Sequence, residues 1–185
     1  MIAGKAPARD LGLLDALDAR ARKPFEGSVW RVCRTGRDPI TGFASLTRWC
    51  DGTFDVLYTA CEKDGAIAEI YFHLSRQPVF PSRVSYGAHR LTVRTETTLD
   101  LSQLDELAEL GVDVPRYREL DYDKTRAIAE AAHFLGFDSL LVPSARFACS
   151  NLVLFTDRLT PEAVDIAESD AGPIDFAAWR RERRG

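Results

Sequence analysis

The stretch GAIAEIYFHL (residues 65–74) sets a helical pattern of apolar residues around one carboxylate. The apolar residues that recur at the i, i+3, i+4 and i+7 spacing, and so share one face of an α-helix, are Ile67, Ile70, Tyr71 and Leu74. Glu69 lies on a neighbouring face, with His73 within reach one turn further on. Two interpretations are open at this point: a solvated helix face that carries a Glu–His pair, or a helix that directs Glu69 into a cleft.

The size and composition of the chain are those of one globular domain. The sequence has 185 residues, of which 45% are hydrophobic and 28% charged, and its formal net charge is −4. A negative chain has no general attraction for nucleic acid, and the basic cluster WRRERRG (179–185) is typical of a solvated tail. We therefore expect no direct nucleic-acid binding by this chain.

The cysteines and the N-terminus indicate the compartment. The four cysteines, at positions 33, 50, 61 and 149, form no zinc-ligand pattern with the three histidines, and we expect reduced, partly buried thiols. The N-terminal sequence lacks the apolar core of a signal peptide, and no stretch is long enough to cross a bilayer. The expectation is a cytoplasmic protein with no metal and no membrane role.

The remaining patterns predict a mixture of helices and strands. Besides the helix that contains Glu69 and stops near Pro78, helices are predicted over residues 10–22, 101–111, 123–136 and 160–169. Strands are predicted over residues 28–34, 54–60, 89–95, 139–143 and 151–155. The order is not a strict βαβ alternation, so the sequence favours a single α+β domain with a split or bent sheet.

One strand carries an unusual charge. In SVWRVCR (28–34), alternation places Arg31 on the same face as Val29 and Cys33. No dinucleotide-binding glycine motif, P-loop, nucleophile elbow or H-E-x-x-H motif is present. A nucleotide, if one is bound, must therefore be held by side chains.

The order of several short motifs resembles the RES family. These motifs are VWRV (29–32), RW (48–49) followed by Gly52 and Thr53, VLYTA (56–60), AEIYFHL (68–74) and LLVPSA (140–145), closing with Asn151. The family is named after an arginine, a glutamate and a serine, which correspond here to Arg31, Glu69 and Ser144. None of these motifs is specific alone, but five short motifs in this order are much stronger evidence than any one of them. The resemblance divides the chain into an N-terminal helical extension (1–26), a RES domain (27–156) and a C-terminal helix with a basic tail (157–185).

The sequence departs from the family pattern at two places. The family's G-R-W-N stretch is TRWC here, with Thr47 before the arginine and Cys50 in the place of the asparagine. Tyr117 or Tyr122 stands near the place of the family's tryptophan. Because a thiol is a weaker hydrogen-bonding group than an amide, Cys50 indicates an altered mouth of the cleft.

The resemblance implies a fold and a class of activity. RES proteins are toxins of bacterial toxin–antitoxin modules, encoded beside an Xre-type antitoxin, and their fold is similar to diphtheria-toxin-like ADP-ribosyltransferases. Members consume NAD as a substrate. Some degrade it by hydrolysis or phosphorolysis, and others transfer ADP-ribose to a protein.

The matched residue types suit this chemistry. Cleavage of the nicotinamide–ribose bond develops positive charge on the ribose, and a fixed carboxylate such as Glu69 stabilises it. Arginine binds phosphate through two parallel hydrogen bonds and stays charged when partly buried, so Arg31 suits the pyrophosphate, with Arg48 assisting.

Three further residues complete the expected NAD site. Tyr58 could stack on the nicotinamide ring, Ser144 could offer its hydroxyl to ribose or amide, and Asn151 closes the set. Ser144 is not expected to be a nucleophile, since no His–Asp relay is evident. Structural alternatives stay open: Arg31 could pair with a carboxylate across the sheet, Tyr58 could belong to the core, and Ser144 could cap a turn.

Three functions are compatible with these residues. The sequence-based hypothesis is a toxin that transfers ADP-ribose from NAD to a protein target. The alternative is an NAD hydrolase or NAD phosphorylase that depletes NAD. A non-catalytic binding protein is the third, and the complete Arg–Glu–Ser set argues against it.

Overall fold

The computed structural model describes residues 9–170 and 172–183. Its elements, in chain order, are α1 (Leu11–Asp18), β1 (Arg22–Arg34), β2 (Leu46–Thr47), β3 (Cys50–Asp51), β4 (Val56–Ala60), α2 (Lys63–Ser75), β5 (Tyr86–Asp100), α3 (Leu104–Glu109), η1 (Val114–Arg116), α4 (Asp123–Phe134), β6 (Ser139–Pro143), β7 (Ser150–Phe155), η2 (Thr156–Arg158), η3 (Pro161–Ala163), β8 (Val164–Ser169) and α5 (Phe176–Glu182).

The main sheet curls back on itself. Its strand order is β1-β4-β7-β6-β5-β8, and β1 also pairs with β5. The β1–β5 pair is antiparallel over almost the full length of both strands, whereas β1 meets β4 at one registered pair, Trp30 opposite Ala60. The sheet therefore opens where β1 leaves β4. The prediction of an α+β domain with a bent sheet is confirmed.

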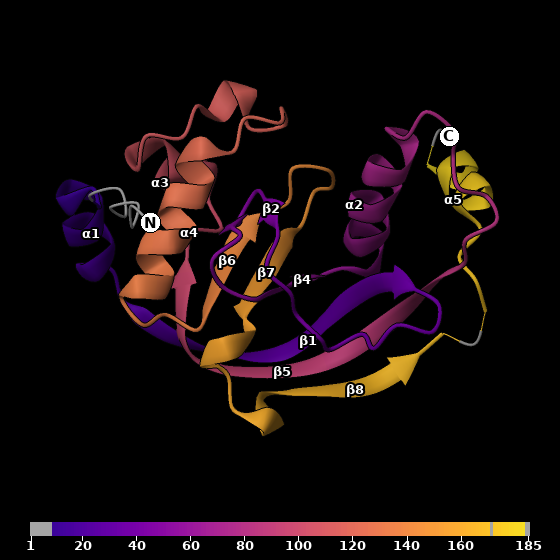
Figure 1. Ribbon diagram of the computed structural model, residues 1–185, viewed down its shortest axis with the longest axis horizontal. Helices are drawn as coiled ribbons and strands as arrows, with labels where there is room; N and C mark the ends of the chain where they lie inside the picture. Colours follow the sequence, from indigo (N-terminus) through magenta and orange to yellow (C-terminus); the bar gives the residue numbers. More distant parts are fainter. Residues whose placement is uncertain (1–8, 171, 184–185) are drawn as a thin grey trace, which may run out of the picture.

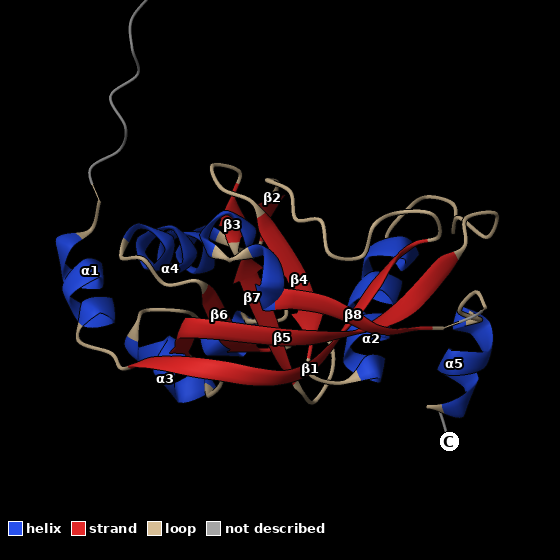
Figure 2. Cartoon of the chain, turned by 90° about the horizontal axis from the view of Figure 1, so that it is seen from below, coloured by secondary structure: helices blue, strands red, loops and turns tan. Residues whose placement is uncertain are grey.

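Helices cover the sheet in two groups. The first group, α1, α3 and α4, lies at one end of the long β1–β5 pair, and the second, α2 and α5, lies at the other (Figure 1, Figure 2). The first group packs on β6 and β7 through fully buried side chains such as Leu17, Ile128 and Phe155. The second packs on β1 and β4 through residues that include Ile67 and Val32. The two groups thus bury separate clusters.

Several predicted elements have nearly the predicted bounds. The helix predicted over 123–136 is α4, and Gly136, at φ 83°, follows it in the left-handed region that favours glycine. The buried strands predicted over 139–143 and 151–155 are β6 and β7, which pair with each other in the centre of the sheet. The strand predicted over 89–95 is longer in the structure, because β5 pairs along its length with β1.

The prediction of a helix over residues 160–169 is wrong. Thr160 and Pro161 begin only the 3₁₀ turn η3, and the chain then continues as β8. β8 pairs antiparallel with the edge of β5, where Ile166 lies opposite Leu91. Backbone pairing at this edge overrides the local helix-start signal.

The N-terminal part of the prediction also needs correction. The helix predicted over residues 10–22 ends at Asp18, and β1 already begins at Arg22. Pro24 lies inside β1, where the register against β5 shifts. A proline cannot donate a ladder hydrogen bond, so it is accommodated at such an irregularity.

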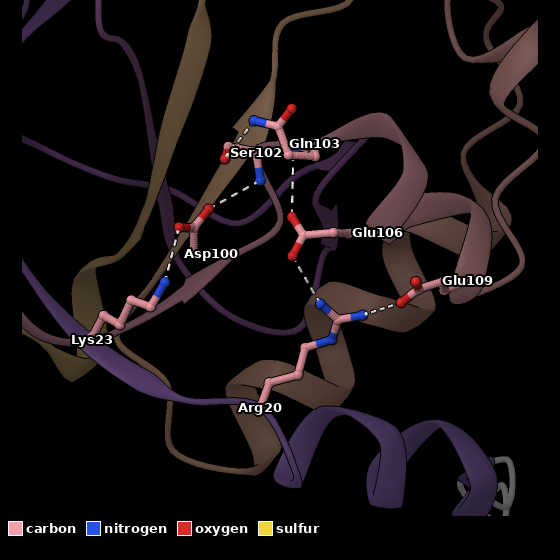
Figure 3. A network of polar contacts seen from close by, with 7 residues as sticks. All are labelled: Arg20, Lys23, Asp100, Ser102, Gln103, Glu106 and Glu109. Carbon is pink, nitrogen blue, oxygen red and sulfur yellow. Dashed lines mark hydrogen bonds and ion pairs between the residues drawn. The ribbon is translucent and has the colours of Figure 1, made fainter.

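A polar network attaches the N-terminal elements to the rest of the domain (Figure 3). Arg20, between α1 and β1, donates to Glu106 at 3.1 Å and to Glu109 at 3.0 Å, both on α3. Lys23 of β1 lies 3.5 Å from Asp100 at the end of β5. Segments far apart in the sequence are joined here by ion pairs.

Two further expectations concern reduced cysteines and membrane-spanning segments. All four cysteines are free thiols: Cys33 and Cys50 are buried, and Cys61 and Cys149 are partly buried. None of the helices within residues 9–170 and 172–183 is long and apolar enough to cross a bilayer.

Candidate active site

A cleft lies between the two helical groups, where β1 diverges from β4. It encloses about 240 Å³. The charged side chains that line it are Arg31 from β1, Arg48 from the β2–β3 turn, Glu69 from α2 and Arg146 from the loop between β6 and β7. The sequence predicts three of these four, and the fold brings those three together.

Glu69 is directed into this cleft by the packing of α2. Ile67 and Leu74 are buried beneath the helix, as the apolar stripe predicts. The Glu69 carboxylate accepts hydrogen bonds from Ser144 Oγ at 2.7 Å and from Asn151 Nδ2 at 3.0 Å, and both reach Oε1. Oε2 accepts no hydrogen bond from the described residues. One carboxylate oxygen is therefore fixed, and the other is available to a ligand.

This geometry decides between the two interpretations of Glu69. His73 also lines the cleft, but the hydrogen bonds of Glu69 go to Ser144 and Asn151 and not to His73. Burial lowers the pKa of His73, and the opposing effect of the Glu69 charge is smaller. Glu69 is a cleft carboxylate rather than half of a solvated pair.

Ser144 holds Glu69 from a tight turn. Its hydroxyl donates to Glu69 and accepts from the backbone N–H groups of Arg146 at 3.1 Å and Phe147 at 3.2 Å. The turn is closed by a hydrogen bond from the Ser144 amide to the Cys149 carbonyl at 2.9 Å. A hydroxyl has one donor and two acceptor positions, and the protein uses all three. A direct contact of Ser144 with NAD stays a prediction.

Asn151 holds the same carboxylate from the central strand β7. This residue is 9% exposed. The amide nitrogen donates to Glu69, while the buried Oδ1 has no hydrogen-bond partner among the described residues. A buried acceptor without a partner costs free energy, which a donor on a bound ligand could recover.

Arg31 lies at the floor of the cleft. Its Nη1 donates to the Tyr58 carbonyl at 2.8 Å, and its buried Nε has no hydrogen-bond partner among the described residues. Burial lowers the pKa of Arg31. Within the described residues no carboxylate lies within 4 Å of this guanidinium, so the alternative of an ion pair across the sheet is not what the fold shows.

Tyr58 orders the TRWC segment. Its hydroxyl forms a hydrogen bond with Thr47 Oγ1 at 2.6 Å and accepts from the Trp49 amide at 2.9 Å. Burial strongly raises the pKa of Tyr58, so the phenol stays neutral. The ring lines the cleft and also packs against the core, which leaves room for the predicted stacking role.

Cys50 does not lie at the mouth of the cleft. Its side chain is fully buried, and its thiol donates to the Phe54 carbonyl at 3.2 Å. The expectation of an altered mouth is corrected in this respect: the departure from the family pattern at this position faces the core. Thr47, the other departure, lines the cleft.

Two further arginines, Arg48 and Arg146, line the cleft and lie over aromatic rings. Arg48 lies over the rings of Tyr117, at 4.7 Å, and Tyr122, at 4.5 Å, so both candidates for the place of the family's tryptophan flank it. Arg146 lies 3.3 Å over the ring of Phe72. The sequence analysis missed Arg146. Its position two residues after Ser144 is the signal that could have found it.

Comparisons with known proteins bear on the family of this chain. A family model described as the RES domain matches residues 28–177. The chain is 33% identical over 153 residues to the "Probable NAD(+) phosphorylase Rv3189" of Mycobacterium tuberculosis, covering 80% of this chain and 73% of that protein. Its fold matches a chain in the crystal structure of the M. tuberculosis MbcT–MbcA toxin–antitoxin complex, with a TM-score of 0.82, 22% identity and coverage of 96% and 100% of the two chains.

The resemblance seen in the ordered motifs is thereby confirmed, since the family match spans most of the chain and includes Arg31, Glu69 and Ser144. This chain belongs to the RES domain family.

Proposed function

We propose that this protein is a RES-family toxin that degrades NAD, with inorganic phosphate as the acceptor of ADP-ribose. The observation that carries the proposal is the Glu69 carboxylate, held on one oxygen by Ser144 and Asn151 in a cleft whose other charged groups are arginines. This arrangement suits a substrate that carries phosphates and develops positive charge on a ribose.

The reaction assigns a step to each group. The bond between nicotinamide nitrogen and ribose C1 breaks, its electron pair leaves with neutral nicotinamide, and an oxygen of phosphate forms a bond to C1. Oε2 of Glu69 stabilises the positive ribose and can accept a hydrogen bond from its hydroxyl. Arg31 binds a phosphate of NAD through its unused donors. The products are nicotinamide and ADP-ribose carrying a phosphate on C1.

The relative named as an NAD(+) phosphorylase favours this reaction over the transfer of ADP-ribose to a protein, which the sequence analysis preferred. The structure adds a second argument: the cleft contains arginines beyond the one assigned to NAD, and these could bind an anionic acceptor. Transfer to a protein becomes the competing outcome of the test below.

A partner protein is the second part of the proposal. The fold match is to a chain of a toxin–antitoxin complex, and we propose that an Xre-type antitoxin binds this chain and blocks the cleft. Co-purification of the two proteins followed by an NAD assay tests this. Activity of the complex equal to that of the free protein would contradict blocking.

To test the activity, the purified protein is incubated with inorganic phosphate, cell extract and NAD that carries a label in its adenylate part. We expect the label in ADP-ribose phosphate, with one nicotinamide released per NAD. Label on a discrete protein band would support transfer instead. Label in free ADP-ribose alone would support hydrolysis.

A further inference from the structure

In the part of the chain that the structure describes, three arginines line the cleft: Arg31, Arg48 and Arg146. Among the described residues, no carboxylate oxygen lies within 4 Å of the side-chain nitrogens of Arg31, Arg48 or Arg146, whereas Arg20 and Arg116 pair with glutamates. An arginine stays charged in proteins, so these charges are available to an anionic ligand. Because Arg31 is assigned to the phosphates of NAD, the role of Arg48 and Arg146 remains to be explained.

Arg146 is held in place by contacts that leave most of its donors free. Its Nη1 donates to the Arg118 carbonyl at 2.7 Å, and the guanidinium carbon lies 3.3 Å from the centre of the Phe72 ring. A guanidinium has five N–H donors. One of them donates to the Arg118 carbonyl, and a side-chain hydrogen bond with Tyr122 also acts on the pKa of Arg146, which leaves at least three donors for a ligand in the cleft.

Arg146 is also coupled to the carboxylate. Its backbone N–H donates to Ser144 Oγ, and the same hydroxyl donates to Glu69, so one short turn positions both the guanidinium and the carboxylate. Burial lowers the pKa of Arg146, and the charge of Glu69 opposes this effect. The Arg146 guanidinium and the Glu69 carboxylate are therefore close enough to act on the same bound ligand.

Phosphorolysis needs such a cation. A phosphate that approaches the ribose beside Glu69 is repelled by the carboxylate, and a neighbouring guanidinium removes this repulsion while binding two phosphate oxygens. Arg31 is on strand β1, whereas Arg146 is in the loop between β6 and β7 that also carries Ser144, the residue that holds Glu69. Arg146 is therefore the cation that the turn positions together with the carboxylate.

We infer that Arg146 binds the attacking inorganic phosphate and so determines the acceptor of the reaction. This inference rests on the proposed function. Arg48, which lies over the two tyrosine rings and also lines the cleft, adds positive potential to the phosphate site. In the absence of Arg146, water becomes the competing acceptor.

The experiment measures initial rates of nicotinamide release by wild type, Arg146→Ala and Arg146→Lys while phosphate and NAD are varied separately. For Arg146→Ala we expect the KM for phosphate to rise at least about tenfold, since a charged hydrogen bond is lost. The KM for NAD should change less than about twofold, and a larger share of the product should be free ADP-ribose. The KM for phosphate of Arg146→Lys should lie between the values of the wild type and of Arg146→Ala. Arg94→Ala removes an exposed arginine on β5 that pairs with Glu26 and should match wild type.

An unchanged KM for phosphate in folded Arg146→Ala overturns the inference, and so does an equal rise in both KM values, which would assign Arg146 to NAD. Circular dichroism checks folding, and Arg146→Lys retains the charge if the alanine variant is unfolded. Wild-type protein whose NAD consumption does not depend on phosphate would overturn the proposed function itself.

Discussion

Arg20 and Arg146 are both partly buried arginines, but their surroundings differ. Arg20 donates to two glutamates in the network that joins α1 to α3 (Figure 3). Arg146 donates to a backbone carbonyl and lies on an aromatic ring, and within residues 9–170 and 172–183 no carboxylate pairs with it. The charge of Arg20 is neutralised within the protein, whereas the charge of Arg146 is positioned without a counter-charge and remains available for a ligand.

Removal of the cleft carboxylate should have the largest effect. Glu69→Gln keeps an amide oxygen that can accept from Ser144 and Asn151, but it removes the charge that stabilises the ribose cation. We expect kcat for NAD consumption to fall at least about a hundredfold without loss of folding. Glu109→Gln removes the same charge from the Arg20 network and should leave kcat unchanged. Near-normal turnover by folded Glu69→Gln would show that the reaction does not depend on this carboxylate.

The second effect concerns the floor of the cleft. Arg31→Lys keeps a positive charge but loses the planar group that can bind two oxygens, so we expect the KM for NAD to rise about tenfold. Steady-state kinetics measure the change, with Arg31→Ala as the reference for complete loss. If lysine is fully tolerated while alanine is not, Arg31 contributes charge alone.

A third change tests the packing of α2 against the turn that holds Glu69. A Cβ atom added at Gly65 would collide with Cys149 Sγ. Gly65→Ala should therefore lower the free energy of unfolding by about 1–3 kcal/mol and reduce activity. Urea unfolding measures the first effect and an NAD assay the second.

The double variant Gly65→Ala/Cys149→Ala removes the sulfur that causes this collision, and it should recover most of the loss. A double variant no better than Gly65→Ala would contradict the steric explanation.

The smallest effect is expected in the paired region. Arg20→Ala breaks ion pairs to Glu106 and Glu109 that are partly exposed to solvent. The free energy of unfolding should fall by about 1 kcal/mol or less, with no change in NAD kinetics. A change in kcat or KM would mean that the two regions are not independent.

The sequence predicts well what depends on local pattern. The stripe on α2 and the apolar runs of β6 and β7 reflect the periodicity of buried residues, and Gly136 marks the end of α4. The ordered motifs predict that Arg31 and Glu69 line one cleft. Sequence-based prediction fails where pairing across the sheet decides the structure, as in β8. The Thr160-Pro161 pair before this strand indicates a helix start but begins only the turn η3. Arg146 was missed for a related reason: the value of an unpaired charge depends on which carboxylates the fold brings near it.

The measurement that tests the central claim most directly follows radiolabelled orthophosphate during the degradation of unlabelled NAD. The account predicts one phosphate incorporated into ADP-ribose for each nicotinamide released by the wild-type protein, and incorporation reduced at least about a hundredfold with Glu69→Gln. Release of nicotinamide without any label in the ADP-ribose product would contradict it.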